Sequence, residues 1–318
     1  MEERERKPLI ILTGPTAAGK TNLSLSLAKA VGGEILSADS MQVYRHMDIG
    51  SAKIGREQMG NVAHHLIDVL EPWEEFHVVR FQELCRESMK GIYERGHIPI
   101  LTGGTGFYIQ AVVKDIDFTE NEENAKFRQE MEALAEKEGA AALHARLQAA
   151  DPEAAAAIHE NNVKRTIRAL EYHMLTGQKI SEHNEAEKKK ESPYRFCYFV
   201  LNEERRRLYE RIDRRVDEML EKGLVREVLQ LKEMGCRREM VSMQGLGYKE
   251  ILDYLDGECS LEEAVYRIKR DTRHFAKRQL TWFRREPDVI WVEKETFGYE
   301  EDKMLSYMLD CLKEKEIL

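Results

Sequence analysis

A glycine-rich octet near the start of the chain constrains the fold more than any other stretch. It reads Gly14-Pro15-Thr16-Ala17-Ala18-Gly19-Lys20-Thr21 and fits the pattern G-x-x-x-x-G-K-[ST] without a mismatch. An apolar run precedes it and an amphipathic pattern follows it. Strand, glycine loop and helix in this order predict a loop whose backbone N–H groups surround phosphate oxygens, rather than an ordinary strand-to-helix turn. Lys20 would reach an outer phosphate, and Thr21 would ligate Mg²⁺ directly or through water.

Bulk properties are typical of a soluble globular protein with one large or two moderate domains. The chain has 318 residues, of which 42% are hydrophobic and 34% are charged. No apolar run is long enough to cross a bilayer, so we expect no membrane partner. The charged N-terminus is unlike a secretory signal, and five scattered cysteines without a C-x-x-C pair favour reduced thiols over disulfides or a zinc site. We therefore expect a cytoplasmic location.

Strand-like and helix-like segments alternate through the first third of the chain. Apolar strand patterns cover residues 9–13, 34–39 and 98–102. Helical spacing lies between them, most clearly at residues 79–93. This alternation predicts an α/β fold, a P-loop NTPase-like parallel sheet flanked by helices. Ligands bind beyond the carboxyl ends of parallel strands, so residues 14–21, 39–44 and 103–106 should converge on one pocket.

The composition changes between residues 117 and 192, where strand-forming residues nearly vanish and Ala, Glu and Lys dominate. We interpret residues 117–192 as an all-helical insertion into an α/β core formed by residues 1–116 and 193–318. Its predicted helices cover residues 130–147, 152–158 and 163–175. An Asp-Pro pair at residues 151–152 is typical of a helix start. The charged run at residues 187–191 should be a solvated loop.

The last third of the chain returns to the sheet. Strand patterns cover residues 194–201 and 289–292, and helical patterns cover residues 203–222, 225–234, 261–285 and 300–318. Between Ala264 and Arg285, eight Lys or Arg residues accompany one acid, although the whole chain has a net charge of −9. Cations mixed with aromatic residues suit an RNA backbone and stacked bases. An amphipathic helix with an aromatic core face is the alternative, and both can hold at once.

Three further groups of residues are candidates for the site. Asp39 follows the second predicted strand and could be a general base. Helix capping is an alternative role that its position favours equally. Adjacent His64 and His65 should point to opposite faces, which favours packing or pocket lining over a metal site. Arg211 and Arg215 share a helical face and could grip a diphosphate. The alternative is a solvated helix whose arginines form ion pairs. This alternative is slightly favoured unless the helix lies over residues 14–21, called the phosphate loop below.

Several motifs in sequence order resemble those of bacterial tRNA dimethylallyltransferases, the tRNA isopentenyltransferase family. Besides the octet they include D-S-M-Q-V-Y at 39–44, M-D-I-G-S-A-K at 47–53, G-G-T-G at 103–106, Q-G-L-G-Y-K at 244–249 and A-K-R-Q at 276–279. The family transfers a dimethylallyl group from dimethylallyl diphosphate to N6 of the adenosine on the 3′ side of the anticodon. The resemblance covers almost the whole chain.

The resemblance implies a role for each matched residue. The loop at residues 14–21 would hold the diphosphate of the prenyl donor, with Mg²⁺, rather than ATP. Asp39 would be the general base, while Thr16 and Arg215 would contact the donor diphosphate. Residues expected to contact the tRNA anticodon stem-loop are Asp39, Ser40, Met41, Gln42, Thr105, Arg128, Lys164, Arg165, Thr166, Ile167, Arg168, Gln244, Gly245, Leu246, Gly247, Tyr248 and Lys249. The basic stretch adds Lys277, Arg278 and Trp282.

Other functions remain open at this point. A P-loop small-molecule kinase would use the same loop for ATP, but it would leave the insertion and the basic stretch unexplained. A nucleotide-gated RNA-binding protein would have no use for Asp39 as a base. Prenyl transfer to a free adenine nucleotide would not require a surface that grips RNA. We expect a monomeric enzyme that acts on tRNA, without zinc, because no matching Cys/His spacing is present.

Overall fold

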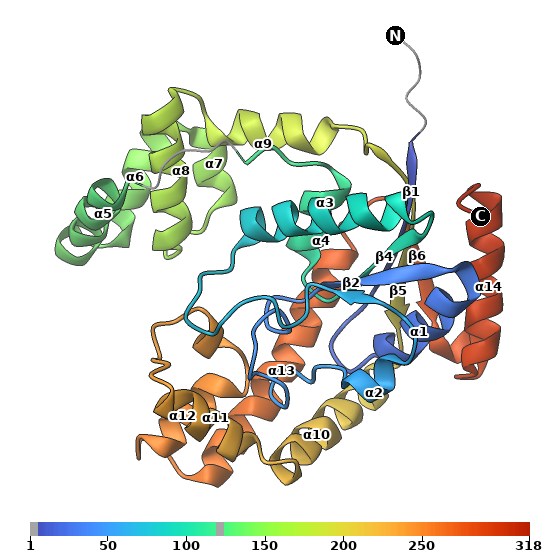
Figure 1. The fold of residues 1–318 in the computed structure, drawn as a ribbon. Coiled ribbons are helices and arrows are strands. Elements are labelled where there is room, and N and C mark those ends of the chain that lie inside the picture. The colour runs from blue at the N-terminus through green and yellow to red at the C-terminus, as the bar shows by residue number, and fades with distance from the viewer. Residues whose placement is uncertain (1–5, 119–123) are drawn as a thin grey trace. The chain divides into compact units, whose positions relative to one another are not determined.

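A six-stranded parallel sheet forms the centre of the larger part of the molecule (Figure 1). Its order is β3-β2-β4-β1-β5-β6, and each neighbouring pair is parallel. The strands are β1 (Lys7–Thr13), β2 (Gly33–Ala38), β3 (His64–His65), β4 (Ile98–Gly103), β5 (Tyr194–Asn202) and β6 (Val289–Glu293). The predicted α/β fold with a parallel sheet is therefore confirmed.

The computed structural model describes residues 6–118 and 124–318, and it divides into two units. One unit comprises Met1–Val113 and Pro193–Leu318, and the other comprises Lys114–Ser192. The division lies close to the predicted limits of the insertion. Within the described residues, no helix combines the length and the apolar character needed to cross a membrane.

Helices cover both faces of the sheet because the strands are apolar on both faces. In β1, Leu9 and Ile11 point to one face while Ile10 and Leu12 point to the other. All four are fully buried, and each contributes about 1.5–3 kcal/mol on burial. The face with Ile10 packs against α1 (Lys20–Val31) and α14 (Glu301–Glu314), which lie side by side in Figure 1.

The opposite face of the sheet carries the larger hydrophobic core. It packs against α3 (Val78–Glu94), α4 (Gly106–Val113), α10 (Arg205–Glu221), α11 (Leu224–Glu233), α12 (Tyr248–Leu255) and α13 (Leu261–Phe283). Short helices α2 (Arg56–Met59), η1 (Ser242–Gln244) and η2 (Lys294–Phe297) lie in the connections. Both α10 and α13 contact the loop at residues 14–21.

The smaller unit is all-helical, as its composition predicts. It contains α5 (Ala125–Glu138), α6 (Ala140–Ala150), α7 (Pro152–Ala157), α8 (Val163–Thr176) and α9 (Ile180–Lys189). Its own core includes Leu143, Leu147 and Ile167. The carboxylate of Asp151 caps α7 by accepting a hydrogen bond from the N–H of Ala154 at 3.0 Å.

Two local predictions in this unit are wrong. The helix predicted over residues 130–147 is two helices, because Gly139 adopts a left-handed φ of 89° and interrupts the helix. The predicted solvated loop at residues 187–191 begins inside α9 instead. Glu187 is buried there and accepts a hydrogen bond from the N–H of Asp117 at 3.0 Å, so this charge has a structural role.

A buried carboxylate joins the amino-terminal ends of three strands. Glu34, which is 4% exposed, accepts hydrogen bonds from Arg95 at 2.8 and 2.7 Å. Rings of His65 and His97 lie 2.6 and 2.7 Å from its oxygens. The hydrogen bonds from Arg95, with those from both histidines, lower the pKa of Glu34 to about 2. His64 contacts the carbonyl of Val62 instead, so the adjacent histidines have different partners.

This carboxylate makes stability depend on pH. Glu34→Gln should lower the free energy of unfolding at neutral pH by about 2 kcal/mol, because charged hydrogen bonds are lost. The folded pKa lies below the ordinary value of 4.5, so the stabilisation is present above that value and is lost as pH falls towards 2. Urea unfolding from neutral to acid pH should show wild type and variant converging. A difference in unfolding free energy that stays the same at all pH values would contradict the role of the Glu34 carboxylate. So would an equal, equally pH-dependent loss in the exposed control Glu57→Gln.

Candidate active site

The three predicted loops meet at the carboxyl edge of the sheet. Residues 14–21 follow β1, residues 39–44 follow β2 and residues 103–106 follow β4, which lies between those two strands. The N–H of Thr105 donates to the carbonyl of Ala38 at 3.2 Å. Gly103 lies so close to Ala38 that a Cβ on this glycine would be 2.2 Å from the Ala38 carbonyl oxygen. The predicted convergence is therefore present in the structure.

Gln279 of α13 joins two of these loops. Its Oε1 accepts a hydrogen bond from the N–H of Thr16 at 2.9 Å, and its Nε2 donates to the carbonyl of Gly104 at 2.9 Å. The side chain is 6% exposed. A Cβ at Gly104 would lie 2.2 Å from Nε2, so glycine is required for this contact. Gln279 was missing from the predicted site residues, although the A-K-R-Q motif contains it.

The phosphate loop has the backbone that its glycines predict. Gly14 and Gly19 have φ values of 148° and 93°, and Ala17 has a φ of 64°, which is uncommon for a residue with a side chain. A Cβ at Gly14 would lie 2.6 Å from the carbonyl oxygen of Leu201. The strain at Ala17 is offset by burial of its methyl group against Leu208 and its neighbours.

Lys20, Arg215 and Asp39 lie within electrostatic reach of one another. Burial, followed by the charge of Arg215, lowers the pKa of Lys20 to about 7, while the charge of Asp39 opposes that shift. The Lys20 ammonium donates to the carbonyls of Gly14 and Pro15 at 3.0 and 2.8 Å. Positive charge is therefore concentrated beside the loop, with one carboxylate facing it.

Asp39 caps the loop that follows it. Its Oδ1 accepts hydrogen bonds from the N–H groups of Met41 and Gln42 at 2.8 and 3.3 Å, which is a local capping arrangement. In the described parts of the chain, its Oδ2 accepts no hydrogen bond. One carboxylate oxygen therefore holds the loop in place.

Helix α10 lies over the phosphate loop. Arg211 Nε donates to the carbonyl of Ala17 at 2.9 Å. Arg215 is partly buried, and burial lowers its pKa while the charge of Asp39 opposes that shift. Arg214, on another side of the helix, is exposed. The contact with Ala17 shows that this helix lies over the phosphate loop. Arg211 and Arg215 are therefore candidates for the site.

Two loops that were predicted to contact tRNA lie against each other. Met41 packs on Gly245, where a Cβ would lie 2.5 Å from the Met41 methyl group. Tyr248 is fully buried, and its hydroxyl donates to Glu227 at 2.8 Å. Its side chain therefore supports the neighbouring loop and is not presented to RNA in this conformation. The other predicted residues of this segment are exposed or partly buried, except buried Gly247: they are Gln244, Leu246 and Lys249.

Glu227 of α11 was not predicted, yet it holds the backbone of the M-D-I-G-S-A-K motif. Its two oxygens accept hydrogen bonds from three consecutive N–H groups, those of Asp48, Ile49 and Gly50, at 2.9, 2.7 and 3.0 Å. A Cβ at Gly50 would lie 2.5 Å from the Tyr248 ring. Nothing in the local sequence around Glu227 marks it, because its partners are remote in the chain.

The predicted tRNA contacts in the helical unit divide into two classes. Lys164, Arg165 and Arg168 are exposed on α8, whereas Thr166 and Ile167 are buried in the core of the unit. One helix cannot present five successive side chains to one surface. Arg128 and Arg168 both donate to Glu171, which is fully buried. Arg128 thus has a partner within its own unit.

The basic stretch forms α13, and ion pairs divide it into two halves. Its first half carries four cations that pair with acids, namely Arg267, Lys269, Arg270 and Arg273. Two of those acids, Asp213 and Asp217, come from α10 and so join the two helices. In the described parts of the chain, no acid pairs with Lys277 or Arg278 in the second half of α13, or with Arg285 just beyond its end.

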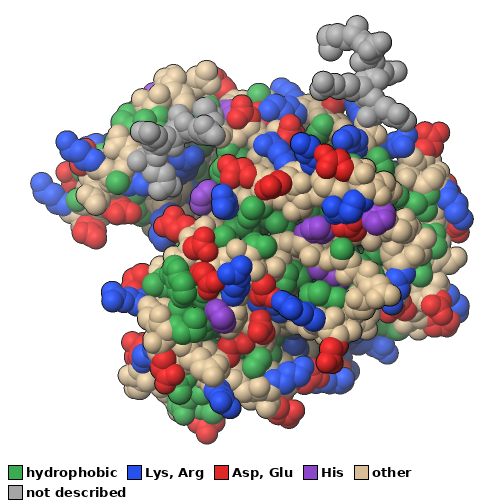
Figure 2. Space-filling model, in the orientation of Figure 1, with side chains coloured by type: hydrophobic (Ala, Val, Ile, Leu, Met, Phe, Trp, Pro, Cys, Tyr) green, Lys and Arg blue, Asp and Glu red, His purple; other side chains and the backbone are tan. Residues whose placement is uncertain are grey.

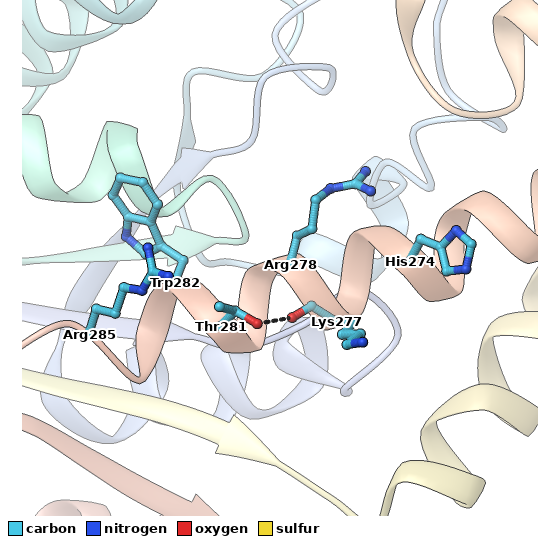
Figure 3. Close-up of a pocket in the computed structure, with 6 residues that line it drawn as sticks. All are labelled: His274, Lys277, Arg278, Thr281, Trp282 and Arg285. Atoms are coloured by element: carbon cyan, nitrogen blue, oxygen red, sulfur yellow. Dashed lines mark hydrogen bonds between the residues drawn. The ribbon is translucent and has the colours of Figure 1, made fainter. Parts of the chain in front are cut away.

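These three cations line a hollow of about 450 Å³ together with His274, Thr281 and Trp282 (Figure 3). Their spacing of three or four residues places all six on adjoining turns. Trp282 lies on Gly106, where a Cβ would approach its ring to 2.3 Å. On the face drawn in Figure 2, positive and negative side chains are interspersed. The three cations that line the hollow, by contrast, form a local positive surface on a protein with a net charge of −9.

Comparison with protein families identifies the chain. It matches the family described as IPP transferase over residues 42–286, and the family described as isopentenyl transferase over residues 7–68. The chain belongs to the IPP transferase family. The longer match includes Arg215, Glu227 and Gln279, whereas the C-terminal strand β6 and η2 lie beyond both matches.

Individual relatives of this IPP transferase cover nearly all of its length. The tRNA dimethylallyltransferase of Lachnoclostridium phytofermentans is 62% identical over 98% of this chain and 99% of that protein. The tRNA dimethylallyltransferase of Carboxydothermus hydrogenoformans is 49% identical over 94% of this chain and 96% of that protein.

Solved structures of the family share the fold. The full-length tRNA isopentenylpyrophosphate transferase of Bacillus halodurans is 44% identical, covers 98% of each chain and superposes with a TM-score of 0.73. A eukaryotic dimethylallyltransferase acting on tRNA is 30% identical, with a TM-score of 0.76 over 90% of this chain and 74% of that one.

The Gln279 bridge can be tested by a near-isosteric substitution. Gln279→Met should lower the free energy of unfolding by about 2 kcal/mol, because it leaves the N–H of Thr16 and the carbonyl of Gly104 buried without partners. Thermal unfolding measures the loss, and calorimetric titration with diphosphate should also show weaker binding. The exposed Gln230→Met is the control and should change neither quantity. An unchanged Gln279→Met protein would show that the bridge contributes nothing.

Proposed function

We propose that this chain transfers a dimethylallyl group from dimethylallyl diphosphate to N6 of the adenosine that follows the anticodon of tRNA on its 3′ side. Diphosphate is the second product. The observation that carries this assignment is the meeting of the phosphate loop, Asp39 and Arg215 at one edge of the sheet, in a chain of the IPP transferase family. Nothing in the site or among the relatives favours a small-molecule kinase.

The reaction has a weak nucleophile, and Asp39 addresses it. The lone pair of the adenine amino group is delocalised into the ring, so the nitrogen attacks carbon poorly unless its proton is removed. Asp39 Oδ2 accepts no hydrogen bond in the described parts of the chain, while Oδ1 is fixed by the N–H of Met41. A carboxylate held in this way can take the proton as the C–N bond forms. The adenine is extruded from its stack to reach it.

The leaving group is the second requirement. As the allylic C–O bond breaks, negative charge builds on the departing diphosphate, and fixed donors stabilise it. The N–H groups of the loop, the ammonium of Lys20 and the guanidinium of Arg215 supply those donors, with the Thr16 hydroxyl beside them. Lys20 exchanges its bonds to the carbonyls of Gly14 and Pro15 for bonds to the diphosphate. The protein aligns the amine, the carbon and the leaving oxygen.

Mg²⁺ suits the residues that are present. Thr21 is exposed in the first turn of α1, and a hydroxyl oxygen is a hard ligand of the kind that Mg²⁺ accepts. Mg²⁺ prefers few protein ligands together with waters and phosphate oxygens. We propose that Thr21 would hold it against the diphosphate, where its charge would favour departure of that group.

The RNA would be held by exposed cations in each unit. In the core unit these include Lys277 and Arg278 beside Trp282, which suit phosphates and an unstacked base. In the helical unit, Lys164 and Arg165 are exposed on α8. We further propose that the enzyme is a cytoplasmic monomer. The five cysteines of the chain are free thiols, as a reducing compartment requires.

One assay separates prenyl transfer from the alternatives. Unmodified tRNA is incubated with the protein, dimethylallyl diphosphate and Mg²⁺ without ATP, and the RNA is then weighed by mass spectrometry. The expected gain is one five-carbon prenyl unit per tRNA. An unchanged RNA mass, or ATP-dependent phosphorylation of a small molecule, would refute the assignment. A free adenine nucleotide offered in place of tRNA should remain unmodified.

The base is tested by a substitution that keeps the loop intact. Asp39→Asn retains an oxygen that can accept the N–H groups of Met41 and Gln42, but it removes the proton acceptor. Transfer should fall by about a hundredfold or more, while tRNA binding is unchanged. Single-turnover rates and a filter-binding assay measure the two quantities. Near-normal rates would exclude Asp39 as the base, and exposed Asp302→Asn should behave as wild type.

A further inference from the structure

Two cationic side chains each hold one carbonyl group of the phosphate loop. Lys294 Nζ donates to the carbonyl of Ala18 at 3.0 Å, and Arg211 Nε donates to the carbonyl of Ala17 at 2.9 Å. Lys294 begins η2 directly after β6, and it is 6% exposed. Burying the ammonium group of a lysine costs free energy, so other groups must stabilise Lys294 at this position.

A buried carboxylate lies between the two cations. Glu203 follows the last residue of β5 and is 5% exposed. Its Oε1 lies 3.6 Å from Lys294 Nζ and 3.5 Å from Arg211 Nε, and it has no hydrogen-bond partner in the described parts of the chain. The attraction of both cations offsets the cost of burying this charge. The same attraction holds each cation opposite its loop carbonyl.

The geometry of the peptide bond turns this contact into a constraint on the loop. In a trans peptide the C=O and the N–H point in opposite directions. The Ala18 carbonyl is turned towards Lys294, so the N–H of Gly19 is turned away from Lys294. In the part of the chain that the structure describes, this N–H donates to no protein acceptor. It is therefore ready to bind an anion inside the loop.

We propose that Lys294 is a positioning residue for the diphosphate of the prenyl donor, acting with Arg211 and Glu203. It fixes the Ala18 carbonyl and so keeps the Gly19 N–H directed at the diphosphate, without touching the substrate itself. The inference rests on the proposed function. It adds a residue that lies beyond residues 7–68 and 42–286, which the two families match. The end of β6 thus becomes part of the site.

The test uses the full-length protein and two ligands. Lys294→Met removes the charge and the donor at similar volume. It should weaken binding of inorganic diphosphate with Mg²⁺ by about tenfold in calorimetric titration, and raise the KM for dimethylallyl diphosphate similarly. The KM for tRNA should not change. Lys294→Arg should recover most of the affinity, because a guanidinium also donates to the carbonyl. The exposed Lys303→Met should match wild type.

Each outcome has a definite meaning. Unchanged diphosphate affinity in Lys294→Met would overturn the proposal, and so would equal rises in the KM values for both substrates, since these indicate a general structural defect. Thermal unfolding checks that each variant is folded. If Lys294→Met does not fold, Lys294→Leu, which also lacks the charge and the donor, is judged by the same criteria. If wild type binds diphosphate but does not prenylate tRNA, the proposed function fails while the positioning role is still decided by the binding data.

Discussion

Carbonyl oxygens of the phosphate loop are held by cationic side chains, and the rest of the site is arranged around this constraint. Lys20 bonds two of these carbonyls, while Arg211 and Lys294 bond one each. The carbonyls held by Arg211 and Lys294 keep the peptide N–H groups that follow them turned to the other side, where the diphosphate would bind. The binding geometry therefore exists before the diphosphate arrives, and helix α10 and the end of β6 are required to maintain it. Lys20, by contrast, would leave its two carbonyls for the diphosphate.

A loop of this kind usually holds a nucleotide, but here its surroundings suit a leaving group. Burial, followed by the charge on Arg215, lowers the pKa of Lys20, so an incoming diphosphate would relieve the repulsion between these two cations. In the proposed reaction, Asp39 faces these cations and takes the proton of the adenine amino group. Gln279 ties the loop to the next one along the sheet, which fixes the distance between the two sides of the pocket. Diphosphate departure and proton removal can thus occur in one rigid frame.

Local sequence predicted the parts of the site that depend on neighbouring residues. The strand–loop–helix around residues 14–21, the parallel sheet and the convergence of three loops all follow from patterns within a few residues. The roles of Gln279, Glu203 and Lys294 could not be found in this way, although Gln279 stands in a matched motif. Gln279 and Lys294 bond backbone atoms far away in sequence, and Glu203 pairs with Lys294 from a distant segment. The burial of Tyr248 was missed for the same reason, since its partner Glu227 lies on another helix. Such contacts exist only once the chain has folded.

In the proposed reaction, the loop at residues 14–21 holds the diphosphate of the prenyl donor. A crystal structure with Mg²⁺ and a non-hydrolysable thiolodiphosphate analogue of the donor tests it most directly. The analogue's diphosphate should accept hydrogen bonds from the N–H groups of Gly19 and Thr21, and Lys20 should have left the carbonyls of Gly14 and Pro15 to bind it. An analogue bound elsewhere, with Lys20 still on those carbonyls, would contradict the account.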